Sequence, residues 1–131
     1  MHNKFFFTIV ASMIALSPAA YAQEQDPTPE EIINSHLDYL CKYIEFDEVQ
    51  LYYVDSTLQY DIPKLMDELS ALRAGGVANS EAYQAVSDKW MEEIDRSYQS
   101  FFTEDQWARY LKTTYGRERK ARQKRMAKRQ Q

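Results

Sequence analysis

The sequence contains a single cysteine, three glycines and two histidines. One cysteine, Cys41, cannot form an internal disulfide, the usual reinforcement of small exported domains. The three glycines form no phosphate-binding loop. Outside residues 1–22 the one histidine is His36, which has no credible serine or cysteine partner for nucleophilic catalysis. We therefore predict that the protein is not an enzyme, and we assign no catalytic residue and no cofactor.

Long apolar runs are also missing. The longest, residues 5–16, has about a dozen residues, whereas a helix that crosses a bilayer needs about 20. It follows a basic residue, Lys4, and precedes the small-residue pattern Ala20-Tyr21-Ala22, as in a secretory signal peptide. We predict a signal over residues 1–22, cleavage after Ala22 and an exported chain. A retained membrane anchor is the alternative.

No alternating strand pattern occurs, and apolar residues instead recur at helical spacing. Thr28 as the cap, Pro29 at the first helical position and Glu31 closing a capping box open a predicted helix that ends near residue 44. A second predicted helix begins after residue 47 and stays in phase across Pro63, which favours one long bent helix over two. Predicted helices over 80–101 and 104–114 follow, the last with Leu111 and Thr114 facing inward. We predict an all-α fold of about four helices, with one domain over residues 23–116. Residues 117–131 are predicted to form a basic helical extension or a frayed tail.

Charge is distributed unevenly. Residues 23–108 hold five basic and nineteen acidic side chains, whereas residues 109–131 hold ten basic and one acidic. We expect a solvated helix face formed by Glu92, Glu93, Asp95 and Arg96. Three interpretations of the tail are open: a solvated helix end, docking on the acidic body of a second copy, and contact with anionic lipid headgroups or acidic polymers. Nucleic acid is not an expected partner, because stacking aromatics are absent after Tyr115. The basic tail residues are Arg117, Arg119, Lys120, Arg122, Lys124 and Arg125.

One helix-start pattern occurs twice, 56 residues apart. Each copy has an aromatic residue, then a capping side chain, and a glutamine three positions after the cap. The glutamine can bond back to the backbone of the cap, which makes the pattern a capping box. We assign these residues a structural role at the two helix starts. They are Phe46, Asp47 and Gln50 in the first copy and Phe102, Thr103 and Gln106 in the second.

These two copies resemble the LTxxQ motif that is repeated in the Spy/CpxP-like family of periplasmic helical proteins. The second copy differs from the motif only by Phe102 in place of leucine, and the first also has Asp47 in place of threonine. The resemblance extends over residues 28–125 and includes the signal. It implies a periplasmic protein with long helices that pairs as an antiparallel, cradle-like homodimer. It further implies an ATP-independent chaperone for unfolded proteins or an envelope-stress adaptor, with a metal-responsive regulatory sensor or a structural dimer as alternatives.

Aromatic residues outside the signal number fourteen, more than one thin helical layer can bury. Five tyrosines lie partly off the apolar stripes and form our candidate surface for binding protein or for dimerisation: Tyr39, Tyr43, Tyr52, Tyr53 and Tyr60. We expect Cys41 to be a buried thiol, with an intermolecular disulfide or a redox-active thiol as alternatives. His36 and Cys41 are five residues apart, about 140° around a helix, so we predict no metal site.

Overall fold

The structure, a computed structural model, describes residues 26–131. The predicted signal over residues 1–22 and its cleavage site lie outside the described residues. Within residues 26–131 the chain forms five helices and no strand, which confirms the all-α prediction. The helices are α2 (Pro29–Tyr43), α3 (Glu48–Ala74), α4 (Ser80–Phe101), α5 (Glu104–Leu111) and α6 (Thr114–Arg129).

The helix starts follow the capping residues of the sequence. The Thr28 hydroxyl accepts a hydrogen bond from the Glu31 backbone, and the Glu31 side chain bonds back to the Thr28 backbone, so the predicted capping box before α2 is confirmed. Asn79 caps α4 by accepting from the Glu81 backbone. Gly75 is the C-cap of α3, and Gly76 follows with a φ of 70°, a backbone conformation that favours glycine.

Helix α3 passes through Pro63 as one helix, in agreement with the prediction of one long helix rather than two. Its stripe of Val54, Leu58 and Ile62 is buried and remains in phase up to the proline. Packing of this stripe against neighbouring helices offsets the hydrogen bond that the proline removes. Helix α3 therefore runs without a break from Glu48 to Ala74.

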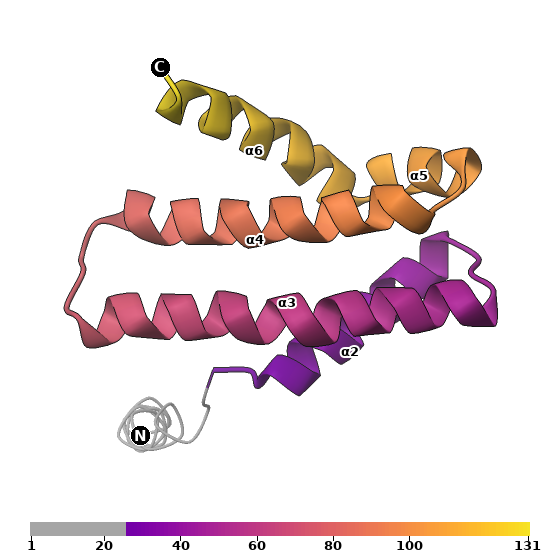
Figure 1. The fold of residues 1–131 in the computed structure, drawn as a ribbon, viewed down its shortest axis with the longest axis horizontal. Coiled ribbons are helices and arrows are strands. Elements are labelled where there is room, and N and C mark those ends of the chain that lie inside the picture. Colours follow the sequence, from indigo (N-terminus) through magenta and orange to yellow (C-terminus); the bar gives the residue numbers. More distant parts are fainter. Residues whose placement is uncertain (1–25) are drawn as a thin grey trace, which may run out of the picture.

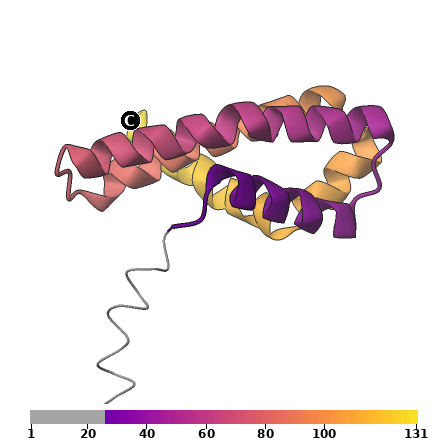
Figure 2. The same cartoon turned by 90° about the horizontal axis from the view of Figure 1, so that it is seen from below.

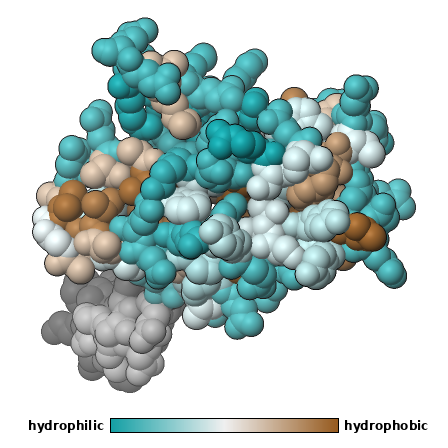
Figure 3. Space-filling view, viewed as in Figure 1, coloured by the Kyte–Doolittle hydropathy of each residue, from teal (hydrophilic) through white to brown (hydrophobic). Residues whose placement is uncertain are grey.

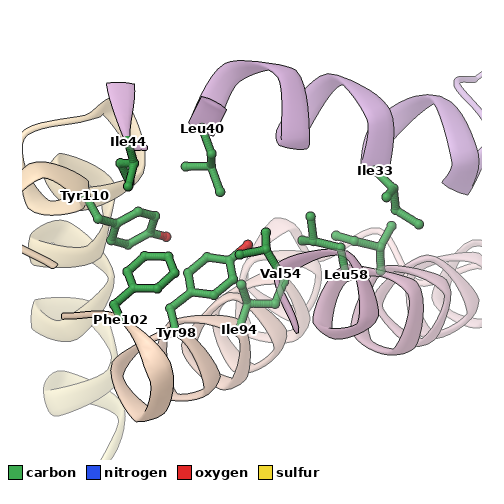
Figure 4. Close-up of a cluster of buried hydrophobic side chains, with 10 residues drawn as sticks. Ile33, Leu40, Ile44, Val54, Leu58, Ile94, Tyr98, Phe102 and Tyr110 are labelled. Carbon is green, nitrogen blue, oxygen red and sulfur yellow. The ribbon is translucent and has the colours of Figure 1, made fainter. Parts of the chain in front are cut away.

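Helices α3 and α4 form a long antiparallel hairpin, and α6 returns along α4 on the side away from α3 (Figure 1). Figure 2 shows that α2 and the start of α6 lie on the same side of this hairpin. A continuous core joins α2 and α5 to the first half of α3 and the second half of α4 (Figure 4). Tyr98 of α4 and Tyr110 of α5 are completely buried in it. The other core residues are Ile33, Leu40, Ile44, Val54, Leu58, Ile62, Ile94 and Phe102.

The last predicted helix ends earlier than expected, and the basic segment after it forms a helix of its own. Helix α5 ends at Leu111, whose side chain is 37% exposed, and α6 begins at Thr114, which is also exposed. The prediction that both face inward was therefore wrong. The turn between the helices brings Gly116 against the end of α5, where a Cβ would lie 2.2 Å from the backbone oxygen of Leu111. Helix α6 runs across the predicted boundary at residue 116, so the basic tail is a helix that begins within the predicted domain.

Candidate functional site

The two copies of the helix-start pattern lie against each other. The Gln50 side chain donates to Oε1 of Gln106 at 2.6 Å, and Gln106 donates to Oε1 of Gln50 at 2.8 Å. The rings of Phe46 and Phe102 are 5.3 Å apart. We call this pair of side-chain amides the glutamine clamp. It joins the start of α3 to the start of α5.

Both amides of the glutamine clamp use their full hydrogen-bonding capacity. Each Oε1 also accepts from the backbone of its own capping residue, Asp47 at 3.2 Å and Thr103 at 2.9 Å. Each Nε2 also donates to the carbonyl of the residue before the other copy: Gln106 donates to Glu45 at 2.9 Å and Gln50 to Phe101 at 3.4 Å. Two donors and two acceptors of each amide are thus satisfied. Each glutamine therefore makes the same four kinds of hydrogen bond as the other, in keeping with the 56-residue repeat.

An open cavity of about 460 Å³ lies over the glutamine clamp, and a second of about 330 Å³ adjoins it along α5. Both are lined by Asp105 and Arg109, which form an exposed ion pair at 2.9 Å. Asp47 and Thr103 line the first and Tyr43 the second. The Asp47 carboxylate already accepts from the Gln50 backbone, so it is used as a cap. The polar groups here support the helix starts, as the sequence predicted.

The basic helix docks on an acidic row of its own chain. Asp88 is 2% exposed and pairs with Arg125 at 2.9 Å and Arg129 at 2.8 Å. Asp95 is 1% exposed and accepts from Arg122. The expectation that Asp95 and Glu92 lie on a solvated face was wrong, because the arginines of α6 cover Asp95 and leave the Glu92 side chain only 19% exposed. We call this set of contacts between α4 and α6 the arginine clamp.

Buried partners complete the arginine clamp around Arg122. Its side chain is 4% exposed and also donates to Glu92 at 3.1 Å. The Tyr110 hydroxyl donates to Asp95 at 2.5 Å. Burial raises the pKa of the Asp95 carboxyl, while the hydrogen bonds from Tyr110 and Arg122 act in the opposite direction. At Asp88 burial also acts to raise the pKa, but hydrogen bonds from the arginines outweigh it, so the pKa is lowered.

Sequence spacing contained a signal for the arginine clamp that the prediction did not use. The acids Asp88 and Asp95 are seven residues apart, as are the arginines Arg122 and Arg129. Seven residues are about two helical turns, so matching rows can meet when two helices run side by side. The pairing is antiparallel, since Asp95 meets Arg122 and Asp88 meets Arg129. Of the three interpretations of the tail, none described this docking within one chain.

The start of α6 is held by aromatic contacts from α2. The His36 ring stacks on Tyr115 with 4.1 Å between centroids and 7° between planes. The Tyr39 hydroxyl accepts from the Thr114 backbone and donates to the Thr114 hydroxyl, both at 3.0 Å. Burial lowers the pKa of His36 to about 4, and its Nε2 has no hydrogen-bond partner among the described residues. His36 therefore packs as a neutral ring.

The five candidate tyrosines do not form one surface. Tyr39 is partly buried and supports α6, and Tyr43 lies near it on α2. Tyr52, Tyr53 and Tyr60 lie together on one face of α3, with exposed fractions of 67%, 46% and 65%. With Val49, which is 59% exposed, these three form what we call the tyrosine stripe.

The tyrosine stripe lies opposite the buried side of α3. Its members stand at positions i, i+3, i+4 and i+11, which share one helix face. The buried positions Val54, Leu58 and Ile62 fall on the other side of the same helix. On the face that Figure 3 shows, apolar residues gather at both ends of the α3–α4 hairpin, while mostly hydrophilic residues cover α6.

The remaining candidates give no ligand site. Cys41 is exposed, so the expectation of a buried thiol was wrong; it lies outside the buried face that Ile33, His36 and Leu40 form. Residues 26–131 contain no group of three or more His, Cys, Asp or Glu side chains placed to hold a metal ion.

No helix in this part of the chain combines the length and apolar character that crossing a membrane requires.

Comparisons of the chain with protein-family models, with curated proteins and with solved structures find no match.

Proposed function

We propose that this chain is an exported, ATP-independent binding protein that holds unfolded or partner polypeptides on the tyrosine stripe of α3. One observation carries the proposal: three tyrosines and a valine of one helix face are left largely exposed, on the side opposite the core. Exposed groups of apolar side chains on a small domain are typical of interaction sites.

Tyrosine suits adaptable recognition of polypeptides. Its ring supplies a large contact area with few rotatable bonds, and its hydroxyl can bond either to the partner or to water. The rings of Tyr52 and Tyr53 are 6.0 Å apart, and the Lys64 ammonium lies 4.5 Å over the ring of Tyr60. The stripe therefore offers apolar, hydrogen-bonding and cationic contacts side by side.

The shape of the stripe favours a chain over a small molecule. From Val49 to Tyr60 it extends about 16 Å along a convex helix face. Small molecules are held in concave sites that bury most of their surface, which a convex face cannot do. An extended or helical segment of another protein can lie along such a face and contact successive turns. The resemblance of the helix starts to the LTxxQ motif agrees with a chaperone or stress-adaptor role.

Aggregation of a chemically unfolded client tests the proposal. We expect the protein in several-fold excess to slow aggregation, and Tyr52→Ser with Tyr60→Ser to remove most of the effect. Tyr43→Ser is the matched control, because Tyr43 is 52% exposed but lies on α2, away from the stripe. Far-UV circular dichroism must show that all variants are folded. Equal protection by the double variant and the wild type would refute the stripe as the binding surface.

Capture from an envelope extract separates the two versions of the proposal. A broad range of unfolded proteins, bound less by the double tyrosine variant, supports the chaperone. One membrane protein bound in the same variant-dependent way supports the adaptor. Because Tyr52 and Tyr60 contribute nothing to the core, sedimentation of the same variants also shows whether the stripe is instead the seam of the homodimer that the resemblance implies.

A further inference from the structure

Helix α6 has two cationic faces with different chemistry. Four arginines point to the arginine clamp: Arg119, Arg122, Arg125 and Arg129. Four other cations are exposed and have no carboxylate partner within residues 26–131: Arg117, Lys120, Lys124 and Lys128. We call these four the outer row. Three of them are lysines, whereas all four inward cations are arginines.

The outer row forms a continuous line. At 100° per residue its members fall within about 80° of the helix circumference, opposite the arginines, and they extend about 16 Å along the axis. The one acid of α6, Glu118, lies on the inner side, where it lines a cavity of about 310 Å³ with Arg122 and Arg125. No apolar side chain interrupts the outer row. Its charge is therefore neither neutralised nor mixed with an apolar face.

We propose that the outer row binds the surface of an anionic lipid membrane. Lysine is a compact, strongly hydrated charge that suits the mobile headgroups of a lipid surface, whereas arginine suits the fixed bidentate pairs found on the inner face. Since no apolar face accompanies the row, the helix lies on the surface without entering the acyl region. The binding is electrostatic and is lost at high salt.

A second copy of the chain fits the outer row less well. The acidic row with matching spacing, Asp88 and Asp95 on α4, is already covered by the arginines of its own chain. Other acids stand in adjacent pairs at helix starts, Asp47 with Glu48 and Glu104 with Asp105, where they complement the helix dipole. A lipid surface presents many equivalent anions in one plane and can meet all four cations of a straight row at once.

The acidic body of the protein does not prevent this contact. At physiological salt the Debye length is about 8 Å, and α6 itself is about 10 Å across. Carboxylates beyond α6 therefore lie more than one Debye length from the headgroups, while the outer row touches them. The arginine clamp also neutralises Asp88 and Asp95, the acids of α4 that pair with α6. The attraction of the outer row is thus stronger than the repulsion from the body.

Vesicle co-sedimentation tests the proposal. The full chain is expressed with its own N-terminal segment and purified in the form that the cell exports. It is then mixed with vesicles of phosphatidylglycerol and phosphatidylcholine, or with vesicles of phosphatidylcholine alone. We expect binding only to the anionic vesicles, and release when salt reduces the Debye length to about 3 Å. Replacing Lys120, Lys124 and Lys128 by glutamine should weaken binding about a hundredfold, because each cation near the surface contributes about fivefold.

A second triple variant separates the position of the charges from their number. Lys42→Gln, Arg73→Gln and Arg96→Gln change the net charge by the same amount on other helices and should leave vesicle binding within about fivefold of wild type. The proposal is overturned if both triple variants bind alike, if neutral vesicles bind as well as anionic ones, or if no vesicle binds. A lysine triple variant that loses self-association, with no vesicle binding by the wild type, would instead assign the row to a second copy.

Discussion

Removing one amide of the glutamine clamp should destabilise the fold strongly. The Gln106 side chain, 8% exposed, makes four hydrogen bonds: to the Thr103 backbone, to the Glu45 carbonyl, and twice to Gln50. At about 1 kcal/mol for each, Gln106→Ala should lower the free energy of unfolding by about 3–4 kcal/mol. That is a large part of the total stability of about 5–15 kcal/mol that single domains have. Urea unfolding followed by far-UV circular dichroism measures it.

A double-mutant cycle isolates the contact between the two helix starts. Gln50→Ala also removes four hydrogen bonds, and two of these are the ones that Gln106→Ala removes. The double variant therefore loses six different bonds rather than eight. Its destabilisation should be smaller than the sum of the single effects by about 2 kcal/mol. Effects that add to within about 0.5 kcal/mol would refute the clamp, because independent caps would behave in that way.

Gln106→Glu separates hydrogen bonding from shape. Glutamate has the same size and can still accept from the Thr103 backbone, but it has no N–H for Gln50 or for the Glu45 carbonyl. We expect it to destabilise the protein at neutral pH at least as much as alanine does. The control is Gln99→Ala, at an exposed position of α4, which should change the free energy of unfolding by less than about 0.5 kcal/mol. A stable glutamate variant would show that the amides only fill space.

Three further predictions concern α6 and its supports. Gly116→Ala should lower the free energy of unfolding by about 3 kcal/mol or more, since the alanine Cβ would lie 2.2 Å from the backbone oxygen of Leu111. Gly75→Ala, whose Cβ would lie 3.4 Å from the backbone oxygen of Ala71, should be nearly neutral in urea unfolding. Burial lowers the pKa of His36 to about 4 in the folded protein, whereas the imidazole has a pKa of about 6.5 in the unfolded chain, so the unfolded chain binds more protons below pH 6.5. The free energy of unfolding should therefore fall by about 3 kcal/mol between pH 6.5 and 4 in the wild type, and by much less in His36→Phe. Arg122→Gln should lower the free energy of unfolding by about 3 kcal/mol and speed tryptic cleavage within α6. Arg96→Gln breaks an exposed ion pair and should change neither the stability nor the rate of cleavage.

Local sequence signals predicted the helices well because helix starts are determined by neighbouring residues. The caps at Thr28, Asp47 and Thr103 are all confirmed, each with a capping box. The continuity of α3 through Pro63 could also be read from the phase of its apolar stripe. What these signals could not show is that the two copies of the pattern touch, since that contact joins residues 56 positions apart.

Non-local pairing explains the errors in the predictions. Asp95 looks like a solvated residue in its own helix, and only α6 covers it. Arg122 looks like one of many cations around a helical wheel, although the structure buries it between two carboxylates. The break after Leu111 depends on the close approach that Gly116 permits, which periodicity does not register. A comparison of the spacing of acids on α4 with the spacing of arginines on α6 was the signal that could have predicted this pairing.

The arrangement of the helices makes the two proposed surfaces independent. Helix α4 lies between α3, which carries the tyrosine stripe, and α6, which carries the outer row (Figure 1). The side chains of both surfaces are exposed and contribute little to the core, so changing one leaves the other in place. The lysine triple variant should therefore still slow aggregation of an unfolded client, and the variant of Tyr52 and Tyr60 should still sediment with anionic vesicles. If both activities were lost together in either variant, client and lipid would share one surface, and the separation of aromatic from cationic contacts argued from α3 and α6 would be wrong.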